Sequence, residues 1–189
     1  ELPPVENLRK FVKMGADLVT FSGGKDIGGP NATGILCGRG DLMEAAFLNS
    51  YIGFEAMGYR NIGRPMKVGR ESIIGLLVAL QRYVEKDHEA EFRAWDKRVK
   101  RMIEKLRKQP SVEAKRVIGN SSTLQIPYVQ LTIDEGALGM NVTDFVNLLK
   151  KKEPIIWVSS HEGKILINPR NLLENEEKIV ISRIKEILR

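Results

Sequence analysis

One lysine in a glycine-rich turn is the residue of this chain best suited to do chemistry. Lys25 stands where a short apolar segment, Asp17–Ser22, runs into the sequence Gly-Gly-Lys-Asp-Ile-Gly-Gly-Pro. Glycines allow a backbone to approach a ligand closely and to take φ values that other residues avoid. A lysine in such a turn serves one of two chemistries. It binds a nucleotide phosphate, or it forms an imine with an aldehyde cofactor.

The spacing excludes a nucleotide-binding phosphate loop. That motif needs a glycine, four residues and then Gly-Lys-Ser/Thr, but Val19 stands at the first glycine position and Asp26 replaces the hydroxyl residue. An imine-forming lysine needs only to lose its proton, which partial burial favours. Ser22 lies just before the glycines and offers a hydroxyl to a cofactor phosphate. The alternative is a solvated lysine in a surface turn, and spacing alone favours that alternative.

The residues around the lysine resemble a known enzyme family. Residues 22–42 read Ser-Gly-Gly-Lys-x-Ile-Gly-Gly-Pro-x-x-x-Gly-Ile-Leu-x-Gly-Arg-x-Asp-Leu. Together with the segments Leu2–Leu8 and Ile62–Val68, this pattern resembles the selenocysteine synthase-like group of fold-type I pyridoxal-phosphate enzymes. That group includes L-seryl-tRNA selenium transferases and D-glucosaminate-6-phosphate ammonia-lyases, and the ammonia-lyase branch is the more similar. The resemblance is dense over residues 2–84 and looser beyond them.

The resemblance implies a role for each candidate site residue. Lys25 would hold pyridoxal 5'-phosphate as an internal aldimine, with Ser22 at the cofactor phosphate. Arg64 and Lys67 lie in a glycine-dotted loop, which in dimers of this fold type reaches the neighbouring subunit's cofactor or substrate. Arg170 matches by position the C-terminal arginine that binds a substrate carboxylate, because a guanidinium binds carboxylates bidentately. The alternatives are an exposed basic loop for the first pair and a surface turn for Arg170.

Composition limits the class of protein. The chain has 189 residues, 42% of them hydrophobic, and a net charge of +6. No apolar run approaches the ~20 residues of a membrane span. The single cysteine, Cys37, excludes an internal disulfide framework and favours a cytoplasmic location. Two histidines without clustered Cys, Asp or Glu provide no metal site. The basic run 97–108 is interpreted as a solvated helix face, since no aromatic residues interleave with its charges to stack bases.

The periodicity predicts mixed α and β structure. We expect an α/β fold in which the C-terminal part of a fold-type I large domain precedes a small α+β domain whose antiparallel sheet carries helices on one face. The expected divisions are 1–84 for the large-domain part, 85–110 for a connecting helix and 111–189 for the small domain. Family members are roughly twice this length, as expected for more than one domain, so we expect a fragment of a longer enzyme.

Individual elements are predicted from apolar spacing and turn signals. Helices are expected over 5–14, over 41–51 with Asp41 as the cap, over 71–84 and 87–108, over 141–152 with Asn141 or Thr143 as the cap, and over 173–188. Strands are expected over 17–22, 34–38, 112–118 and 128–133, with a hairpin joining 155–160 to 164–168. The glycines at 53, 58 and 63 are expected to punctuate a loop.

These inferences predict a pyridoxal-phosphate-dependent lyase that eliminates ammonia from an amino sugar acid or a related amino acid. The first alternative is a selenium-transferase-like enzyme acting on aminoacyl-tRNA. The second is a non-catalytic fragment or assembly domain. The expected partners are a small anionic amino substrate and further copies of the chain, as a homodimer or a larger homo-oligomer. Binding of tRNA is a lesser expectation, and no membrane partner is expected.

Overall fold

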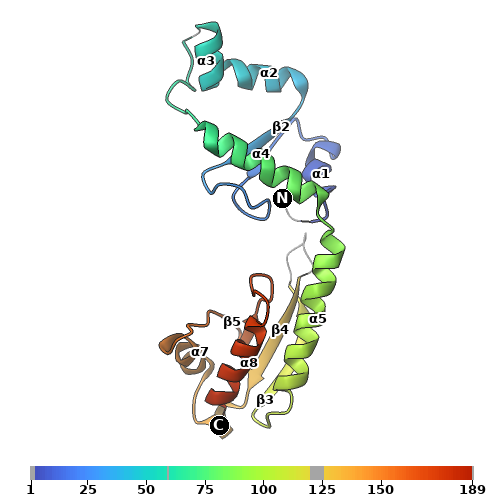
Figure 1. The fold of residues 1–189 in the computed structure, drawn as a ribbon, viewed down its shortest axis with the longest axis vertical. Coiled ribbons are helices and arrows are strands. Elements are labelled where there is room, and N and C mark those ends of the chain that lie inside the picture. Colours follow the sequence, from blue (N-terminus) through green and yellow to red (C-terminus); the bar gives the residue numbers. More distant parts are fainter. Residues whose placement is uncertain (1–2, 59, 120–125, 189) are drawn as a thin grey trace. The chain divides into compact units, whose positions relative to one another are not determined.

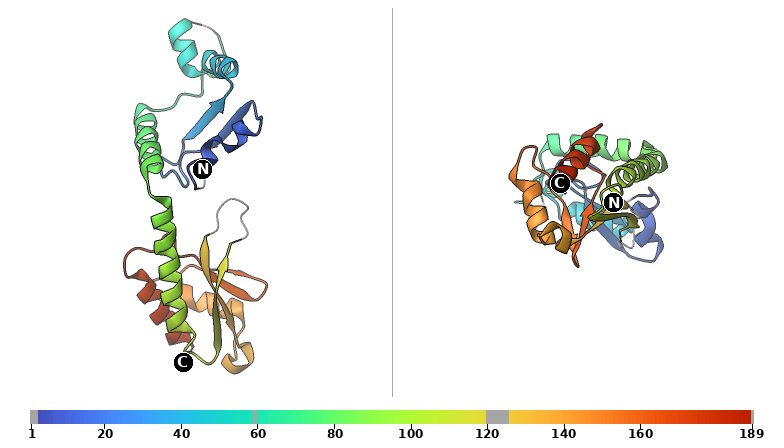
Figure 2. Two further views of the ribbon diagram at one scale, coloured as in Figure 1. Left: turned by 90° about the vertical axis from the view of Figure 1, so that its right-hand side faces the viewer. Right: turned by 90° about the horizontal axis from the view of Figure 1, so that it is seen from below.

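A computed structural model describes residues 3–58, 60–119 and 126–188 of the chain. The chain forms two compact units, Glu1–His88 (unit 1) and Glu89–Arg189 (unit 2), drawn in Figures 1 and 2. The expected connecting helix over 87–108 is present as α5 (His88–Leu106), and its apolar face packs in the core of unit 2. The division of the whole protein into 1–84, 85–110 and 111–189 stays a prediction.

Unit 1 contains a hairpin whose two strands flank the lysine turn. Its elements are α1 (Asn7–Lys13), β1 (Leu18–Ser22), β2 (Gly34–Gly38), α2 (Gly40–Leu48), α3 (Tyr51–Met57) and α4 (Arg70–Glu85). The strands β1 and β2 pair antiparallel, with Ser22 opposite Gly34 and Leu18 opposite Gly38. The predicted strands are therefore confirmed, and the pairing makes residues 23–33 a long loop anchored at both ends.

The segment after the hairpin differs from the expected single helix and loop. Two short helices, α2 and α3, replace the helix expected over 41–51, and the residue before α2 is Arg39 rather than a capping aspartate. The Ser50 side chain accepts a hydrogen bond from the Gly53 N–H, at 3.3 Å, and so begins α3. A Cβ at Gly53 would lie 2.5 Å from the Phe47 carbonyl oxygen. Gly53 is thus a helical residue that permits a tight reversal between two helices.

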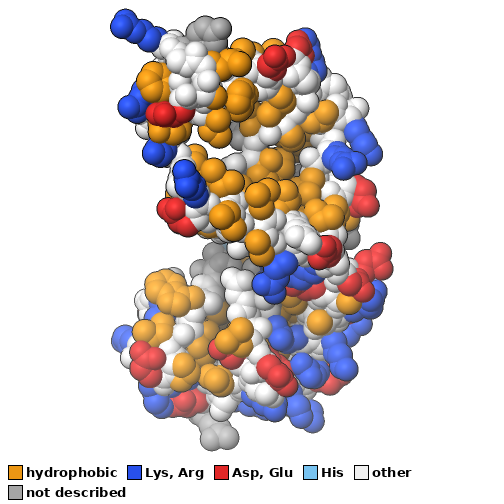
Figure 3. All heavy atoms as spheres, turned by 45° about the horizontal axis from the view of Figure 1, so that its top comes forward, with side chains coloured by type: hydrophobic (Ala, Val, Ile, Leu, Met, Phe, Trp, Pro, Cys, Tyr) orange, Lys and Arg blue, Asp and Glu red, His pale blue; other side chains and the backbone are white. Residues whose placement is uncertain are grey.

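Unit 1 has little buried apolar surface of its own. Among its described residues only Ile27 and Tyr83 are buried hydrophobics. Helix α4 exposes a row of large apolar side chains, including Ile74 at 62%, Leu77 at 61% and Val78 at 53% of their surface. Figure 3 shows hydrophobic side chains gathered over this part of the molecule. A hydrophobic face this wide is typical of a surface that another protein segment covers.

Unit 2 is built around a four-stranded antiparallel sheet. Its elements after α5 are β3 (Val112–Ile118), β4 (Pro127–Ile133), α6 (Glu135–Leu138), α7 (Val142–Lys151), β5 (Ser159–His161), β6 (Lys164–Ile167) and α8 (Glu176–Ile187). The strand order is β3-β4-β6-β5. The two-residue turn Glu162–Gly163 takes positive φ angles of 49° and 70°, which joins β5 tightly to β6.

The core of unit 2 lies between one face of this sheet and three helices. Alternate residues of β4, Val129, Leu131 and Ile133, enter a single hydrophobic cluster with side chains of α5, α7 and α8. Leu149 of α7 and Ile184 of α8 are fully buried there. Because a strand points successive side chains to opposite faces, the three helices share one face of the sheet. The predicted α+β arrangement is confirmed.

Two elements of unit 2 are shorter than the sequence suggests. The strand expected from residue 155 begins only at Ser159. The helix expected from residue 173 begins at Glu176, because Asn175 takes a left-handed conformation with φ 68°. The Leu173 N–H instead donates to Glu176 Oε2 at 2.8 Å. Of the two caps predicted for α7, Asn141 and not Thr143 takes the role, accepting from the Asp144 N–H at 2.9 Å.

Candidate functional site

The lysine turn is held by its own backbone. Gly23 N–H donates to the Thr33 carbonyl at 2.9 Å, and Gly29 N–H donates to the Gly23 carbonyl at 2.8 Å. A third bond, 2.9 Å long, runs from the Gly28 N–H to the carbonyl of Lys25 itself. The peptide groups on both sides of Lys25 are therefore fixed without using its side chain.

Two glycines of the turn are required by close contacts. A Cβ at Gly24 would lie 2.6 Å from Asn31 Cα and 2.9 Å from the Asn31 carbonyl oxygen. A Cβ at Gly23 would lie 2.5 Å from Leu76 Cδ1 of α4. The contacts at Gly24 are with backbone, which cannot move aside as a side chain can. These glycines therefore serve the packing of the turn itself, and the close approach to a ligand that the sequence suggests stays a prediction.

Substituting Gly24 with alanine is therefore expected to destabilise the protein by about 1–3 kcal/mol, the usual cost of overpacking. Gly40 is the matched control, because an added Cβ at this residue meets nothing within 4 Å. Gly40→Ala is expected to change the unfolding free energy by less than ~1 kcal/mol. Urea unfolding of the two variants measures the difference. Equal unfolding free energies would show that the turn yields to a Cβ at residue 24.

The side chain of Lys25 is exposed and available. Within residues 3–58, 60–119 and 126–188, no hydrogen bond or ion pair occupies its ammonium group. Ser22, at the end of β1, is half-buried. The two candidates thus belong to one loop, with Ser22 at its fixed end and Lys25 near its tip.

Arg39 and Asp41, the Arg-x-Asp pair of the family-like motif, lie at the end of the hairpin that carries this loop. Arg39 Nη1 lies 2.8 Å from Asp17 Oδ1, and its Nη2 lies 2.6 Å from Asp41 Oδ2. The hydrogen bond to Arg39 holds the pKa of Asp41 below its usual value, and the pKa of Arg39 is raised by Asp41 and then by Asp17. Asp41 is therefore a partner of Arg39 and not the expected helix cap.

The loop with Arg64 and Lys67 is fastened to the α2–α3 turn. Asn61 Nδ2 donates to the carbonyls of Leu48 and Ser50, at 2.7 and 3.0 Å. Arg64 Cζ lies 4.7 Å from the centre of the Phe54 ring, and Lys67 Nζ lies 4.8 Å from the centre of the Tyr51 ring. These cation–π contacts hold two exposed cations side by side on the aromatic face of α3.

The structure brings Arg64 and Lys67 together, but not with Lys25. No contact among the described residues joins Lys25 to either cation. Residues close to each in sequence do line one cavity of about 330 Å³. Thr33 and Gly34, at the end of the lysine loop, contribute to it together with Tyr51 and Met66 from the region of the two cations. Among the described residues the two loop cations are thus separate from Lys25, and their contact with a neighbouring subunit's cofactor or substrate stays a prediction.

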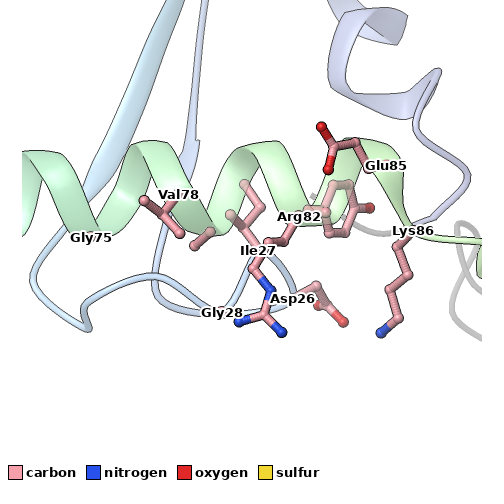
Figure 4. A pocket seen from close by; sticks show the side chains of 10 residues that line it. Asp26, Ile27, Gly28, Gly75, Val78, Arg82, Glu85 and Lys86 are labelled. Atoms are coloured by element: carbon pink, nitrogen blue, oxygen red, sulfur yellow. The ribbon is translucent and has the colours of Figure 1, made fainter.

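A larger hollow lies beside the lysine turn, and its cations were missed from the sequence. It has a volume of about 730 Å³ and lies between Asp26, Ile27 and Gly28 of the turn and one side of α4. Figure 4 shows Arg82 extending from α4 toward Asp26 and Gly28, with Lys86 on the same side. The signal was available: Arg82 and Lys86 follow Val78 at four-residue spacing, which puts all three on one helix face.

Arg170 belongs to unit 2, where it is ordered by α5. Its Cζ lies 5.5 Å from the centre of the Trp95 ring, and its N–H donates to Asn168 Oδ1 at 3.0 Å. It lies just after β6 and is partly buried. The Trp95 side chain itself is buried, with 7% of its surface exposed.

The histidines have structural roles. His88 Nε2 lies 2.8 Å from the Tyr83 carbonyl oxygen, and His161 is the last residue of β5 rather than part of the hairpin turn. Among the described residues, no group of three or more His, Cys, Asp or Glu side chains is placed to hold a metal ion. Over the same residues, none of the helices combines the length and apolar character needed to cross a bilayer.

Comparisons with known proteins identify the family. A family model described as L-seryl-tRNA selenium transferase matches residues 2–173. The 5'-C-glycyluridine monooxygenase-decarboxylase of a Streptomyces species is 34% identical over 184 residues, which cover 96% of this chain and 43% of that protein. The D-glucosaminate-6-phosphate ammonia lyase of Salmonella typhimurium is 25% identical over 185 residues, covering 96% of this chain and 46% of that protein.

Solved structures agree on the fold. A structure of D-glucosaminate-6-phosphate ammonia-lyase matches with a TM-score of 0.75 and 25% identity, over 97% of this chain and 46% of that one. A C-DES variant with glycine covalently linked to its PLP cofactor matches with a TM-score of 0.50 and 20% identity, over 92% of this chain and 47% of that one. The chain thus spans less than half the length of these proteins. It belongs to the L-seryl-tRNA selenium transferase family, and over that part of their length it has the α/β fold of the fold-type I pyridoxal-phosphate-dependent enzymes.

Proposed function

We propose that the protein containing this chain is a pyridoxal-phosphate-dependent enzyme in which Lys25 holds the cofactor through its Nζ. One observation carries the proposal. A lysine whose ammonium group has no partner among the described residues is presented by a turn that the backbone alone holds in shape. The turn lies within the part of the chain matched by the family model. The cofactor fits this donor set because an amine is the group that condenses with an aldehyde.

The other candidate residues have roles suited to their chemistry. Ser22 offers its hydroxyl to the cofactor phosphate from the fixed end of the loop. Arg64 and Lys67 are two cations held by aromatic rings, and they attract a phosphate or an anionic substrate from a neighbouring subunit. Arg170 binds the substrate carboxylate. Because the loop cations serve a neighbouring subunit, the proposed protein works as a homodimer or larger homo-oligomer. Its proposed location is the cytoplasm.

The first candidate reaction is the release of ammonia from a small anionic amino acid, such as an amino sugar acid. When bound, pyridoxal phosphate supplies an electron sink next to the substrate Cα. Lys25 Nζ takes the proton from Cα as a general base, and the β-hydroxyl of the substrate leaves as water. Ammonia is then released when water hydrolyses the imine form of the product. Arg170 orients the carboxylate meanwhile, and the two loop cations bind the phosphate end. The match to D-glucosaminate-6-phosphate ammonia-lyase at a TM-score of 0.75 favours this reaction.

A second candidate is decarboxylation at the same carbon. It is favoured by the relative named as a monooxygenase-decarboxylase, whose 34% identity exceeds the 25% of the ammonia lyase. The family description itself keeps selenium transfer on aminoacyl-tRNA as an alternative. The remaining alternative is a non-catalytic fragment or assembly domain. Ammonia release from D-glucosaminate 6-phosphate, carbon dioxide release from a glycyl nucleoside and a gel shift with tRNA separate the three reactions.

Chemical trapping tests the assignment of Lys25. The full-length protein is loaded with pyridoxal phosphate, reduced with sodium borohydride, digested and analysed by mass spectrometry. We expect a stable pyridoxyl group on the peptide that contains Lys25, and none on that peptide when borohydride is omitted. A modification confined to other lysines, or no modification at all, would overturn the proposal. The 189-residue chain alone is expected to bind the cofactor weakly and the full-length protein tightly. Weak binding by both would favour the non-catalytic alternative.

A further inference from the structure

The turn that contains Arg170 is tied to α5 by one guanidinium group. Arg98 Nη1 donates to the Pro169 carbonyl at 2.9 Å and to the Leu172 carbonyl at 2.8 Å. These two carbonyls lie on either side of Arg170 in the chain. The Arg98 side chain is only 18% exposed, and Pro169 is fully buried. The backbone on both sides of Arg170 is therefore fixed to a long helix.

A buried carboxylate keeps Arg98 in place. The Glu177 side chain, in the first turn of α8, is 7% exposed. Its Oε1 lies 2.8 Å from Arg101 Nη2, and its Oε2 lies 3.7 Å from Arg98 Nε. Among the described residues, Glu177 Oε2 and Arg98 Nε have no hydrogen-bond partner. A buried charge is costly unless it is paired, so Glu177 favours the conformation in which Arg98 remains beside it.

The guanidinium of Arg170 is directed by the same helix. Trp95 precedes Arg98 by one helical turn on α5, and its buried ring lies 5.5 Å from Arg170 Cζ. Trp95 therefore orients the side chain of Arg170, while Arg98 fixes the backbone that carries it. The contacts of Arg98 with the turn and of Trp95 with the guanidinium thus both come from α5.

This arrangement corrects part of the sequence interpretation. The basic run over 97–108 was expected to be a solvated helix face. Arg98 instead bonds to carbonyls 71 and 74 residues further along the chain, and Arg101 bonds to a buried carboxylate. Arg98 and Arg101 are therefore parts of a hydrogen-bond and ion-pair network that fixes a loop, and not only solvated charges.

We propose that Arg98 is a positioning residue, which together with Glu177 holds the Pro169–Leu172 turn so that Arg170 presents its guanidinium to the substrate carboxylate. The inference rests on the role of Arg170 in the proposed function. It assigns Arg98 no contact with substrate or cofactor. It also predicts that Arg98 and Arg170 act on the same step, namely substrate binding.

Arg101 provides a matched control. It shares Glu177 with Arg98, but no hydrogen bond among the described residues links it to the Pro169–Leu172 turn. Arg98→Met and Arg101→Met therefore each remove one cation from the same buried carboxylate, and only the first removes the bonds to the turn. Arg98→Lys is the conservative variant, which keeps the charge and restores a donor without the planar fork.

The experiment uses the full-length holoenzyme, with two readouts. Hydrogen exchange measured by mass spectrometry is expected to rise in peptides covering residues 168–173 in Arg98→Met, but not in Arg101→Met. With D-glucosaminate 6-phosphate as the probe, KM is expected to rise roughly ten-fold in Arg98→Met, corresponding to ~1.4 kcal/mol, with kcat little changed. Arg98→Lys is expected to recover part of this loss. The double variant Arg98→Met/Arg170→Met is expected to be no worse than Arg170→Met alone.

Each outcome decides a separate point. If Arg170→Met raises KM and Arg98→Met does not, the positioning role is overturned and the role of Arg170 stands. If Arg170→Met leaves KM unchanged, the role of Arg170 falls, and this inference falls with it. If no ammonia is released by the unsubstituted enzyme, the first candidate reaction fails, and the exchange measurement alone decides whether Arg98 fixes the turn. If Arg98→Met does not fold, Arg98→Lys takes its place in every comparison.

Discussion

Replacing Lys25 with alanine is expected to leave the full-length protein folded but unable to retain pyridoxal phosphate through dialysis. Turnover is expected to fall by roughly a thousand-fold or more, because one amine serves both as the cofactor's attachment point and as the base at Cα. The fold should tolerate the change. The Lys25 side chain is exposed, and the turn is held by backbone hydrogen bonds from Gly23, Gly28 and Gly29.

Visible absorbance of the dialysed protein and steady-state turnover measure this result. Lys13→Ala is the control, since Lys13 is an exposed lysine of the same unit at the end of α1. It is expected to leave both quantities unchanged. A Lys25→Ala protein that keeps its visible absorbance and its turnover would remove Lys25 from the chemistry.

The second large effect is expected in the core of unit 2. Leu149 of α7 is fully buried in the hydrophobic cluster that α7 forms with the sheet and α8, whereas Leu173 is 71% exposed. Leu149→Ala is expected to lower the unfolding free energy of unit 2 by about 2–5 kcal/mol, because it removes buried methyl groups and leaves a cavity. Leu173→Ala makes the same chemical change at the surface and is expected to cost less than ~0.5 kcal/mol.

Urea unfolding of the 189-residue chain, followed by tryptophan fluorescence, measures the pair. Both tryptophans of the chain, Trp95 and Trp157, lie in unit 2, so the signal reports on this unit. A small and equal effect of the two substitutions would mean that the cluster around Leu149 is not the core that stabilises the unit.

Local signals predicted most of the elements. The apolar alternation of Tyr128–Ile133 predicted a strand, and β4 (Pro127–Ile133) confirms it. The strand is more buried than alternation suggests, since none of its residues is exposed. The turn with Lys25 follows its predicted strand directly, because glycines and an apolar run are a purely local pattern. Asn141 was recognised as a cap for the same reason, since its partner Asp144 is three residues away.

The errors involve contacts between distant residues. Nothing local shows that Arg39 binds Asp17, 22 residues away, and so engages Asp41 in a three-residue cluster. Arg98 finds its partners more than seventy residues away, which no helical periodicity reveals. Gly53 looked like a loop residue because glycine weakens helices, and its place in α3 depends on how closely α2 approaches.

The candidate site shows the same limit. Types and spacing left Lys25 open between an imine-forming residue and a solvated one, and the family resemblance made Lys25 and Ser22, which share one loop, the candidates. The sequence also pointed to Arg64 and Lys67, whose shared aromatic support at Tyr51 comes from the fold. Arg82 and Lys86 were overlooked because their four-residue spacing shows that they share a helix face, but not that this face borders a pocket. The placement of a helix against a turn is a tertiary property.

Leu76 links the lysine turn to the exposed apolar face of α4. Leu76 Cδ1 lies in close contact with the positions that a Cβ at Gly23 or Gly29 would occupy, so α4 packs directly against the lysine turn. The same helix leaves Ile74 and Leu77 in water. A protein segment that packs on Ile74 and Leu77 would restrain α4 and, through Leu76, the loop of residues 23–33. If the loop binds pyridoxal phosphate as proposed and that binding depends on the restraint, thermodynamic linkage requires that cofactor binding strengthens the association of the covering segment by the same factor.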